Sequence, residues 1–297
     1  AQAILRKRSR RTALSWGGYR GAPTVERAFA MSGSGISVDK QAGGIAVVTL
    51  AREPVNTMGM AFWKELRAVV DDLEADAGVR AMIFRSGLKK NVFTAGLDIQ
   101  ELYAPNSSEA KFREYWAALT TTLVKIYATP KMTAAAVKGA CPAGGCCLSL
   151  CCDYRVITAD GTMGLNEVRG GIPPPVFWVE LFAKIAGQQR AELLLMRGDM
   201  TPSAKLLEYG LVHAVVENEG ELLPATTKEV QRLLMSPDAG RAMTKNMLRQ
   251  ELAKRWSEGC AWEAGIGWKT ISDPRSVAAM TKVLKMLAEG RAKMSKL

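Results

Sequence analysis

The stretch that decides the fold is Gly139-Ala140-Cys141-Pro142-Ala143-Gly144-Gly145, which joins an apolar, strand-like run to an apolar, helix-like one. The first turn of a helix carries backbone N–H groups that have no partner inside the helix, and a glycine pair leaves room for another group to approach them. Such N–H groups can stabilise a negative charge that develops on an oxygen. The stretch therefore predicts a strand–turn–helix unit with an anion-binding turn. The alternative is that the glycine pair only permits tight packing of the strand against the helix.

One carboxylate follows in Gly164-Leu165-Asn166-Glu167, about twenty residues later, in a run with few other titratable side chains. An anion-binding turn together with one acid suggests an enzyme that moves a proton beside a carbonyl group. The alternative for Glu167 is a helix cap or a surface position, which is the usual fate of a glutamate.

The composition excludes several other classes of site. The chain has 297 residues, of which 48% are hydrophobic, so it can bury a sizeable core, and no apolar run approaches the length of a membrane span. The single histidine, His213, argues against a Ser-His-Asp triad and against a site with several histidine ligands; we expect it to be structural. Five of the six cysteines crowd into residues 141–152 without a C-x-x-C pair, so we expect buried, reduced thiols rather than a metal site. Free thiols fit a reducing compartment.

The positive charge is concentrated at the N-terminus. The net charge is +11, and residues 1–25 contain six Lys and Arg and no acid. This arm looks like a mitochondrial transit peptide, and the alternative is a basic arm that binds acidic partners or nucleic acid. The Gly-rich break Ser32-Gly33-Ser34-Gly35 separates it from the body, so we treat residues 1–35 as an extension that is either a transit peptide or a docking arm.

Strand-like apolar runs alternate with amphipathic segments along the body, which is typical of an α/β fold. We expect strands at residues 44–51, 79–84, 132–137, 154–158 and within 210–216. We expect helices at residues 60–75, 108–127, 144–152, 188–196, 223–235, 237–256 and 273–291, and a helical turn at 97–103. The pattern becomes mostly helical after residue 175, so we divide the body into a core, residues 36–222, and a helical region, residues 223–297.

Several motifs, in this order and at this spacing, resemble the crotonase (enoyl-CoA hydratase/isomerase) superfamily. They are Pro54-Val55-Asn56, Val92-Phe93-Thr94-Ala95-Gly96-Leu97-Asp98-Ile99, Gly139 to Gly145, Cys152-Asp153-Tyr154-Arg155, and Gly164 to Glu167 followed by Gly171-Ile172. Each motif alone is weak, but their ordered combination is specific. Within the superfamily, the segments at 141–145 and 164–167 are most similar to those of the mitochondrial Δ3,Δ2-enoyl-CoA isomerases.

The resemblance implies a spiral of ββα turns, with the helical region at 223–297 used in trimer packing. It implies that the backbone N–H groups of Ala95 and Gly145 hold the thioester oxygen and that Glu167 is the catalytic base. Hydratases of this family use two glutamates, and the first of them matches Leu148 here, which favours isomerisation with one base over hydration. Coenzyme A is implied to lie along the following residues, mostly through backbone atoms: Val55, Ala95, Gly96, Leu97, Asp98, Ile99, Gly144 and Gly145. Asp98 is expected to position its loop rather than to react.

Three functions remain open at this stage. The first is an isomerase of fatty-acid β-oxidation in the mitochondrial matrix, with an acyl-CoA substrate, no metal or redox cofactor, and a homotrimeric or heterotrimeric assembly. The second is a crotonase-fold subunit of a larger mitochondrial complex that docks through residues 1–35. The third is an RNA-binding homologue, which the charge suggests but which lacks a clustered stripe of basic and aromatic residues.

Overall fold

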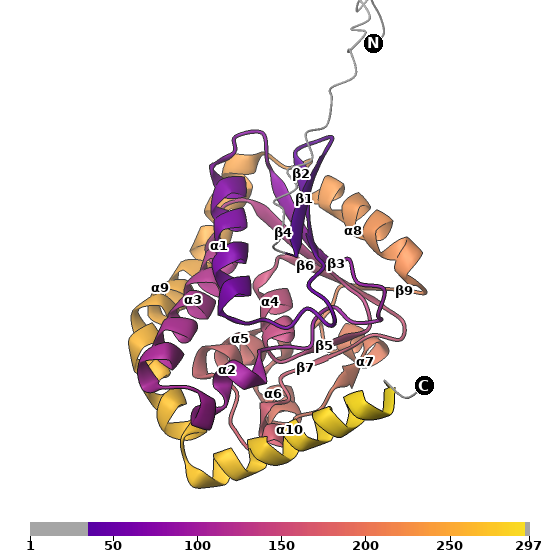
Figure 1. Ribbon diagram of the computed structural model, residues 1–297. Coiled ribbons are helices and arrows are strands. Elements are labelled where there is room, and N and C mark those ends of the chain that lie inside the picture. The colour runs from indigo at the N-terminus through magenta and orange to yellow at the C-terminus, as the bar shows by residue number, and fades with distance from the viewer. Residues whose placement is uncertain (1–34, 295–297) are drawn as a thin grey trace, which may run out of the picture.

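The computed structural model describes residues 35–294, and the chain forms an α/β fold around two sheets (Figure 1). The larger sheet has the strand order β1-β2-β3-β4-β6-β9. Its strands are β1 (Ile36–Gln41), β2 (Ile45–Leu50), β3 (Ala81–Ser86), β4 (Met132–Val137), β6 (Tyr154–Thr158) and β9 (Ala214–Val216). The smaller sheet has the order β5-β7-β8, formed by β5 (Ala140–Pro142), β7 (Thr162–Gly164) and β8 (Thr201–Pro202). The extension predicted for residues 1–35 lies, except for Gly35, outside the described residues.

The helices cover both faces of the larger sheet. The described helices, including those that lie away from this sheet, are α1 (Met60–Ala75), α2 (Ile99–Leu102), α3 (Glu109–Ala128), α4 (Gly144–Cys151), α5 (Val176–Ala186), α6 (Gln188–Arg197), α7 (Ser203–Glu208), α8 (Glu219–Leu233), α9 (Asp238–Ile271) and α10 (Pro274–Met294), with 3-10 turns η1 (Ala104–Asn106) and η2 (Glu167–Gly170). Helices α1, α3 and α4 join the main apolar core on one face, while α8 closes a smaller cluster on the other face (Figure 1). None of the helices described between residues 35 and 294 combines the length and apolarity that a membrane crossing requires.

The relative orientation of neighbouring strands follows from how they are connected. Strands β1 and β2 form an antiparallel hairpin, whose turn uses Gly43 and Gly44 with φ of 78° and 77°. All later strands of the larger sheet pair in parallel, which requires crossover connections such as α1 and α3. Strand β4 is buried at every position because helices cover both of its faces.

Several predicted elements have the bounds that the sequence indicated. Helix α1 and strands β4 and β6 match the predicted residues, and α3 begins after Ser108, whose hydroxyl accepts from the N–H of Lys111. Strand β1, the three strands of the smaller sheet and helix α5 were not predicted. The helix predicted at 237–256 is too short, because α9 continues to Ile271. Glycines at 259, 265 and 267 make a helix end plausible there, but in the structure they let α9 lie close to its neighbours.

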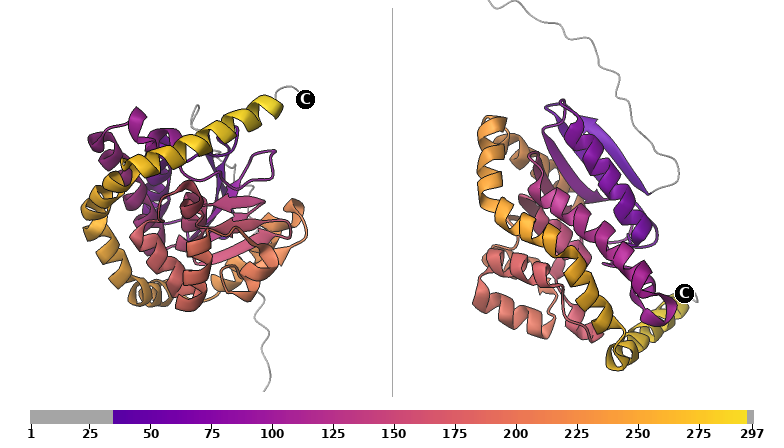
Figure 2. Two further views of the ribbon diagram at one scale, coloured as in Figure 1. Left: turned by 90° about the horizontal axis from the view of Figure 1, so that it is seen from below. Right: turned by 90° about the vertical axis from the view of Figure 1, so that its left-hand side faces the viewer.

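The helical region predicted at residues 223–297 packs extensively on the rest of the chain. Its boundary falls inside α8, where Leu222, Thr226 and Val230 are buried against the sheet. Helix α9 runs along α3, as the right-hand view of Figure 2 shows. Helix α10 lies over η2, and the hydroxyl groups of Tyr103 and Thr281 are 2.8 Å apart. The role of this region in trimer packing stays a prediction.

Among the described residues, neither the cysteines nor His213 belong to a group of three or more side chains that could coordinate a metal ion. The five cysteines at residues 141–152 are buried, as predicted, and burial raises the pKa of the Cys141 thiol to about 12. The imidazole of His213 stacks on Tyr154 and its Nδ1 accepts from the N–H of Arg155, so its contacts are structural. Burial lowers the pKa of His213 to about 4.

Candidate active site

The small sheet brings the glycine turn and the Glu167 segment together. Strand β5 pairs in parallel with β7, and the N–H of Ala143 donates to the carbonyl of Gly164 at 2.8 Å. Gly139, which opens the turn, has a φ of 57°, and a Cβ at this position would lie 2.0 Å from the carbonyl oxygen of Asn91. The turn therefore requires glycine at position 139. The two motifs are adjacent because one strand of each forms this sheet.

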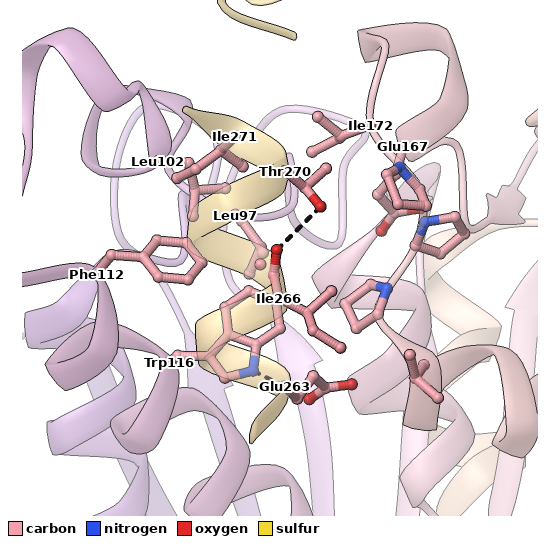
Figure 3. A pocket seen from close by; sticks show the side chains of 15 residues that line it. Leu97, Leu102, Phe112, Trp116, Glu167, Ile172, Glu263, Ile266, Thr270 and Ile271 are labelled. Carbon is pink, nitrogen blue, oxygen red and sulfur yellow. Dashed lines mark hydrogen bonds between the residues drawn. The ribbon is translucent and has the colours of Figure 1, made fainter. Parts of the chain in front are cut away.

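Glu167, at the start of η2, lines a cavity of about 140 Å³ (Figure 3). The lining is largely apolar and comes from three remote parts of the chain: residues 97–116, residues 167–176 and the second half of α9. The lining residues are Leu97, Leu102, Phe112, Trp116, Glu167, Ile172, Pro173, Pro174, Pro175, Val176, Glu263, Ile266, Gly267, Thr270 and Ile271. We call it the Glu167 cavity.

The carboxylate of Glu167 has the surroundings of a reactive group. Both of its oxygens are buried, and neither makes a hydrogen bond with another of the described residues. Burial raises the pKa of Glu167 to about 7, so its proton is gained and lost near neutral pH. A buried carboxylate without a partner is costly for the fold, so its presence in a cavity points to a functional role.

The prediction for Ala95 is wrong. Its N–H donates to the carbonyl oxygen of Val55 at 2.8 Å and is therefore not free to hold a ligand oxygen. The N–H of Gly96 is also occupied, by the hydroxyl of Thr94 at 2.8 Å. The next N–H, that of Leu97, makes no hydrogen bond with any described residue. Leu97 also lines the Glu167 cavity, so its N–H is the better candidate donor.

The other expected donor lies at the start of α4. The first backbone hydrogen bond of this helix is from Cys147 to Ala143, so within the described residues the N–H groups of Gly144 and Gly145 stay unpaired. Gly144 faces Leu97: a Cβ on Gly144 would lie 2.7 Å from the Leu97 Cδ2. A Cβ on Gly145 would lie 2.4 Å from the Thr94 Cγ2. The glycine pair thus also permits tight packing, which was the alternative interpretation.

The remaining residues of the predicted coenzyme A path form one loop surface. Val55, Leu97, Asp98 and Ile99 are half-buried, and Ala95 is exposed. The Asp98 carboxylate accepts from the N–H of Gln100 at 2.9 Å and caps α2. It holds the start of α2 in this way and does not line the cavity, and the expectation that it does not react stays a prediction.

Asn56 ties this loop surface to the sheet. Its side-chain Nδ2 donates to the carbonyl of Leu50 at 3.0 Å, to the hydroxyl of Ser86 at 3.1 Å and to the carbonyl of Phe93 at 2.9 Å. Its Oδ1 accepts from the N–H of Arg52 at 2.7 Å. The Pro54-Val55-Asn56 motif therefore fixes the two loops that carry Val55 and Ala95.

Leu148 and Glu263 bear on whether the site holds one free carboxylate or two. Leu148 is fully buried in α4 and does not line the cavity. A second carboxylate, that of Glu263 on α9, does line it and was missed at the sequence level. The sequence does contain a feature that could have identified Glu263, because it is the only charged residue in the apolar run at 259–268. Its two oxygens accept from the indole N–H of Trp116 and the N–H of Phe177, so Glu167 is the unengaged carboxylate of the lining.

Comparison with known proteins identifies the family to which the chain belongs. The model of the enoyl-CoA hydratase/isomerase family matches residues 40–292. The chain belongs to the enoyl-CoA hydratase/isomerase family. The α/β fold described above is therefore the crotonase fold, and Leu97 and Glu167 line one cavity in it.

The chain is similar both to proteins that are named isomerases and to proteins that are named hydratases. The rat mitochondrial enoyl-CoA delta isomerase 1 is 34% identical over 239 residues, which is 80% of this chain and 81% of the rat protein. The crystal structure of human mitochondrial delta3-delta2-enoyl-CoA isomerase superposes with a TM-score of 0.82 at 30% identity, covering 86% of this chain and 99% of the human one. A crotonyl-CoA hydratase of Syntrophomonas wolfei is 31% identical over 211 residues, 71% of this chain and 76% of the hydratase.

Proposed function

We propose that the protein is a Δ3,Δ2-enoyl-CoA isomerase that converts 3-cis- or 3-trans-enoyl-CoA into 2-trans-enoyl-CoA. The observation that carries the proposal is the unengaged Glu167 carboxylate in a largely apolar cavity whose other carboxylate, that of Glu263, accepts a hydrogen bond at each oxygen. Hydration needs a second group to orient the attacking water, whereas moving a double bond needs one group that both takes and returns a proton.

The steps follow from this arrangement. The thioester makes the C2 proton acidic, and the Glu167 carboxylate removes it. The electron pair moves into a dienolate, whose oxygen is held by the N–H of Leu97 and by those of the first turn of α4 at Gly144 and Gly145. Protonated Glu167 then delivers the proton to C4, and the double bond forms between C2 and C3. No metal or redox cofactor takes part in this sequence.

The direct test is a spectrophotometric assay with 3-hexenoyl-CoA and the purified chain. We expect formation of 2-hexenoyl-CoA that increases with enzyme concentration. Absence of turnover with every 3-enoyl-CoA, in a chain that is folded and binds acyl-CoA, would favour a non-catalytic subunit instead.

The pH profile reports the buried base. Because the carboxylate is the active form and the pKa of Glu167 is raised to about 7, we expect kcat/KM to be constant above that value and to fall about tenfold per pH unit below it. An ordinary glutamate would keep its activity down to about pH 4.5. A profile that is flat from pH 8 to pH 5 would contradict the assignment of Glu167 as the base.

Hydration should be a minor reaction. We expect crotonyl-CoA to be hydrated at least about a hundredfold more slowly than 3-hexenoyl-CoA is isomerised, since no second free carboxylate of residues 35–294 lines the cavity. The two rates are measured on one preparation, with loss of the crotonyl absorbance as the readout. Comparable rates would place the chain among the hydratases of its family.

The cellular setting belongs to the same proposal. The similar isomerases carry the word mitochondrial in their names, and the basic residues 1–25 resemble a transit peptide. We therefore assign the enzyme to fatty-acid β-oxidation in the mitochondrial matrix, as a trimer of crotonase-fold chains. Docking to a larger assembly through residues 1–35 is the second candidate, and the concentration of positive charge there favours it.

A further inference from the structure

One wall of the Glu167 cavity is built around Glu263, a carboxylate that the proposed reaction does not use. Its side chain is buried, with 3% of the residue exposed. The Oε2 atom accepts from the indole Nε1 of Trp116 at 3.0 Å, and Oε1 accepts from the backbone N of Phe177 at 3.1 Å. One side chain of α9 thus holds a side chain of α3 and the first turn of α5.

The surrounding helix face is shaped for close contact. Gly259, Glu263 and Gly267 are spaced four residues apart and lie on the same face of α9. A Cβ on Gly259 would lie 2.6 Å from the ring of Phe177, and one on Gly267 would lie 2.9 Å from the ring of Phe112. Two aromatic rings therefore press against the glycines, and Glu263 supplies the polar contact between them.

Both donors need an acceptor at this position. A carboxylate offers two acceptor oxygens, whereas glutamine offers one oxygen and turns an NH2 group towards the other donor. Burial raises the pKa of Glu263, and the N–H groups of Trp116 and Phe177 act against that rise by favouring the ionised form. Replacing Glu263 by glutamine leaves at least one of these N–H groups without a good partner.

We call Glu263 together with its two hydrogen-bond donors, the Trp116 indole and the Phe177 backbone N–H, the clamp. The clamp lies away from Glu167, the proposed base. Figure 3 shows Glu167 on one side of the cavity and Trp116 with Glu263 on another, and Trp116 stacks on Phe112 with ring centroids 5.2 Å apart. An acyl chain whose thioester lies beside Leu97 and Glu167 extends towards these rings. The position of the Trp116 indole therefore limits how far the chain can reach.

We propose that Glu263 is a positioning residue that sets the depth of the acyl cavity, and with it the chain length that the enzyme accepts, by fixing the Trp116 indole and the first turn of α5. This inference rests on the proposed function, because it assigns the cavity to the acyl chain. It assigns Glu263 no part in the proton transfer.

The test is a chain-length series with the full chain: 3-hexenoyl-, 3-octenoyl-, 3-decenoyl- and 3-dodecenoyl-CoA. In Glu263→Gln the Trp116 indole loses its hydrogen-bond acceptor and can turn away from the cavity. The kcat/KM for longer acyl chains should therefore increase relative to that for shorter ones. We expect the ratio of kcat/KM for 3-dodecenoyl-CoA to that for 3-hexenoyl-CoA to rise at least about tenfold, through KM, with kcat for 3-hexenoyl-CoA changed less than about twofold.

Two further variants make the test decisive. Trp116→Phe keeps an aromatic ring but removes the indole N–H, and should shift the ratio in the same direction even if Glu263→Gln folds poorly. Glu258→Gln, an exposed position on the same helix, should leave the ratio unchanged. An unchanged ratio in both Glu263→Gln and Trp116→Phe, or an equal loss at every chain length, overturns the proposal.

Binding separates this inference from the proposed function. Dissociation constants of saturated hexanoyl- to dodecanoyl-CoA, measured by calorimetry, need no turnover. If the wild-type chain isomerises nothing but Glu263→Gln still shifts the preference towards longer acyl-CoA, the isomerase proposal fails and the clamp stands. If turnover is normal and neither binding nor kcat/KM shifts, the clamp alone fails.

Discussion

Glu167→Gln is expected to lower isomerisation of 3-hexenoyl-CoA at least about a hundredfold, because it removes the one unengaged carboxylate of the cavity. The amide has nearly the same shape, so the dissociation constant for a saturated acyl-CoA should stay within about twofold. The measurement is kcat at saturating substrate at pH 8, where the wild-type carboxylate is ionised. Near-normal turnover would exclude Glu167 as the base.

The same variant should not be less stable than the wild type. Because the folded-state pKa of Glu167 is raised to about 7, its contribution to stability is fully present below the unfolded pKa of about 4.5 and is lost as pH rises through about 7. At pH 8 the wild type therefore bears the cost of a buried charge that glutamine avoids. The measurement is the urea midpoint of the variant minus that of the wild type, at pH 8 and at pH 5. A larger difference at pH 8 would show that the variant has lost its chemistry and not its folding.

Asn56→Asp is expected to destabilise the fold by at least about 3 kcal/mol. The substitution exchanges the Nδ2 donor for a carboxylate oxygen that faces the carbonyl oxygens of Leu50 and Phe93 at about the present distances of 3.0 and 2.9 Å. Repulsion then replaces attraction in a site with no exposed surface. The readout is the urea unfolding midpoint at pH 8, where an aspartate is ionised.

A surface position supplies the control for this prediction. Asn106→Asp makes the same chemical change at an exposed residue and should alter stability by less than about 0.5 kcal/mol. Equal effects at the two positions would mean that the Asn56 hydrogen bonds contribute nothing specific. The loops carrying Val55 and Ala95 should also loosen in Asn56→Asp, which hydrogen exchange of the Ala95 amide would detect.

Local patterns were enough to predict several strands and helices of the fold, whereas the role of Glu167 came from the family resemblance and stays a prediction. The apolar runs at 132–137 and 154–158 and the amphipathic run at 60–75 have the predicted bounds because their periodicity agrees with their burial. The pairing of the glycine turn with the Glu167 segment was consistent with the motif order. Strand β1 was harder to see, since only Ile36 of its six residues is buried.

The errors arose where long-range contacts decide the structure. The N–H of Ala95 is used by Val55, forty residues earlier in the chain, and no local pattern reveals such a bond. The length of α9 was underestimated because glycine disfavours an isolated helix. In the structure, Gly259 and Gly267 admit the rings of Phe177 and Phe112, and Gly265 admits the guanidinium group of Arg113. Glu263 was missed for the same reason, since its helix was expected to end before it.

The three-part lining of the Glu167 cavity has a consequence for synthesis on the ribosome. The chain between Leu97 and Pro175 is made well before the second half of α9, whose residues Glu263 to Ile271 complete the walls. Until that helix docks, water reaches the Glu167 carboxylate, and its pKa stays in the ordinary range of a glutamate. An emerging chain therefore holds all its proposed reacting groups but not the dry surroundings that tune them. We expect the proposed activity to begin only when the last quarter of the sequence has folded back onto α3.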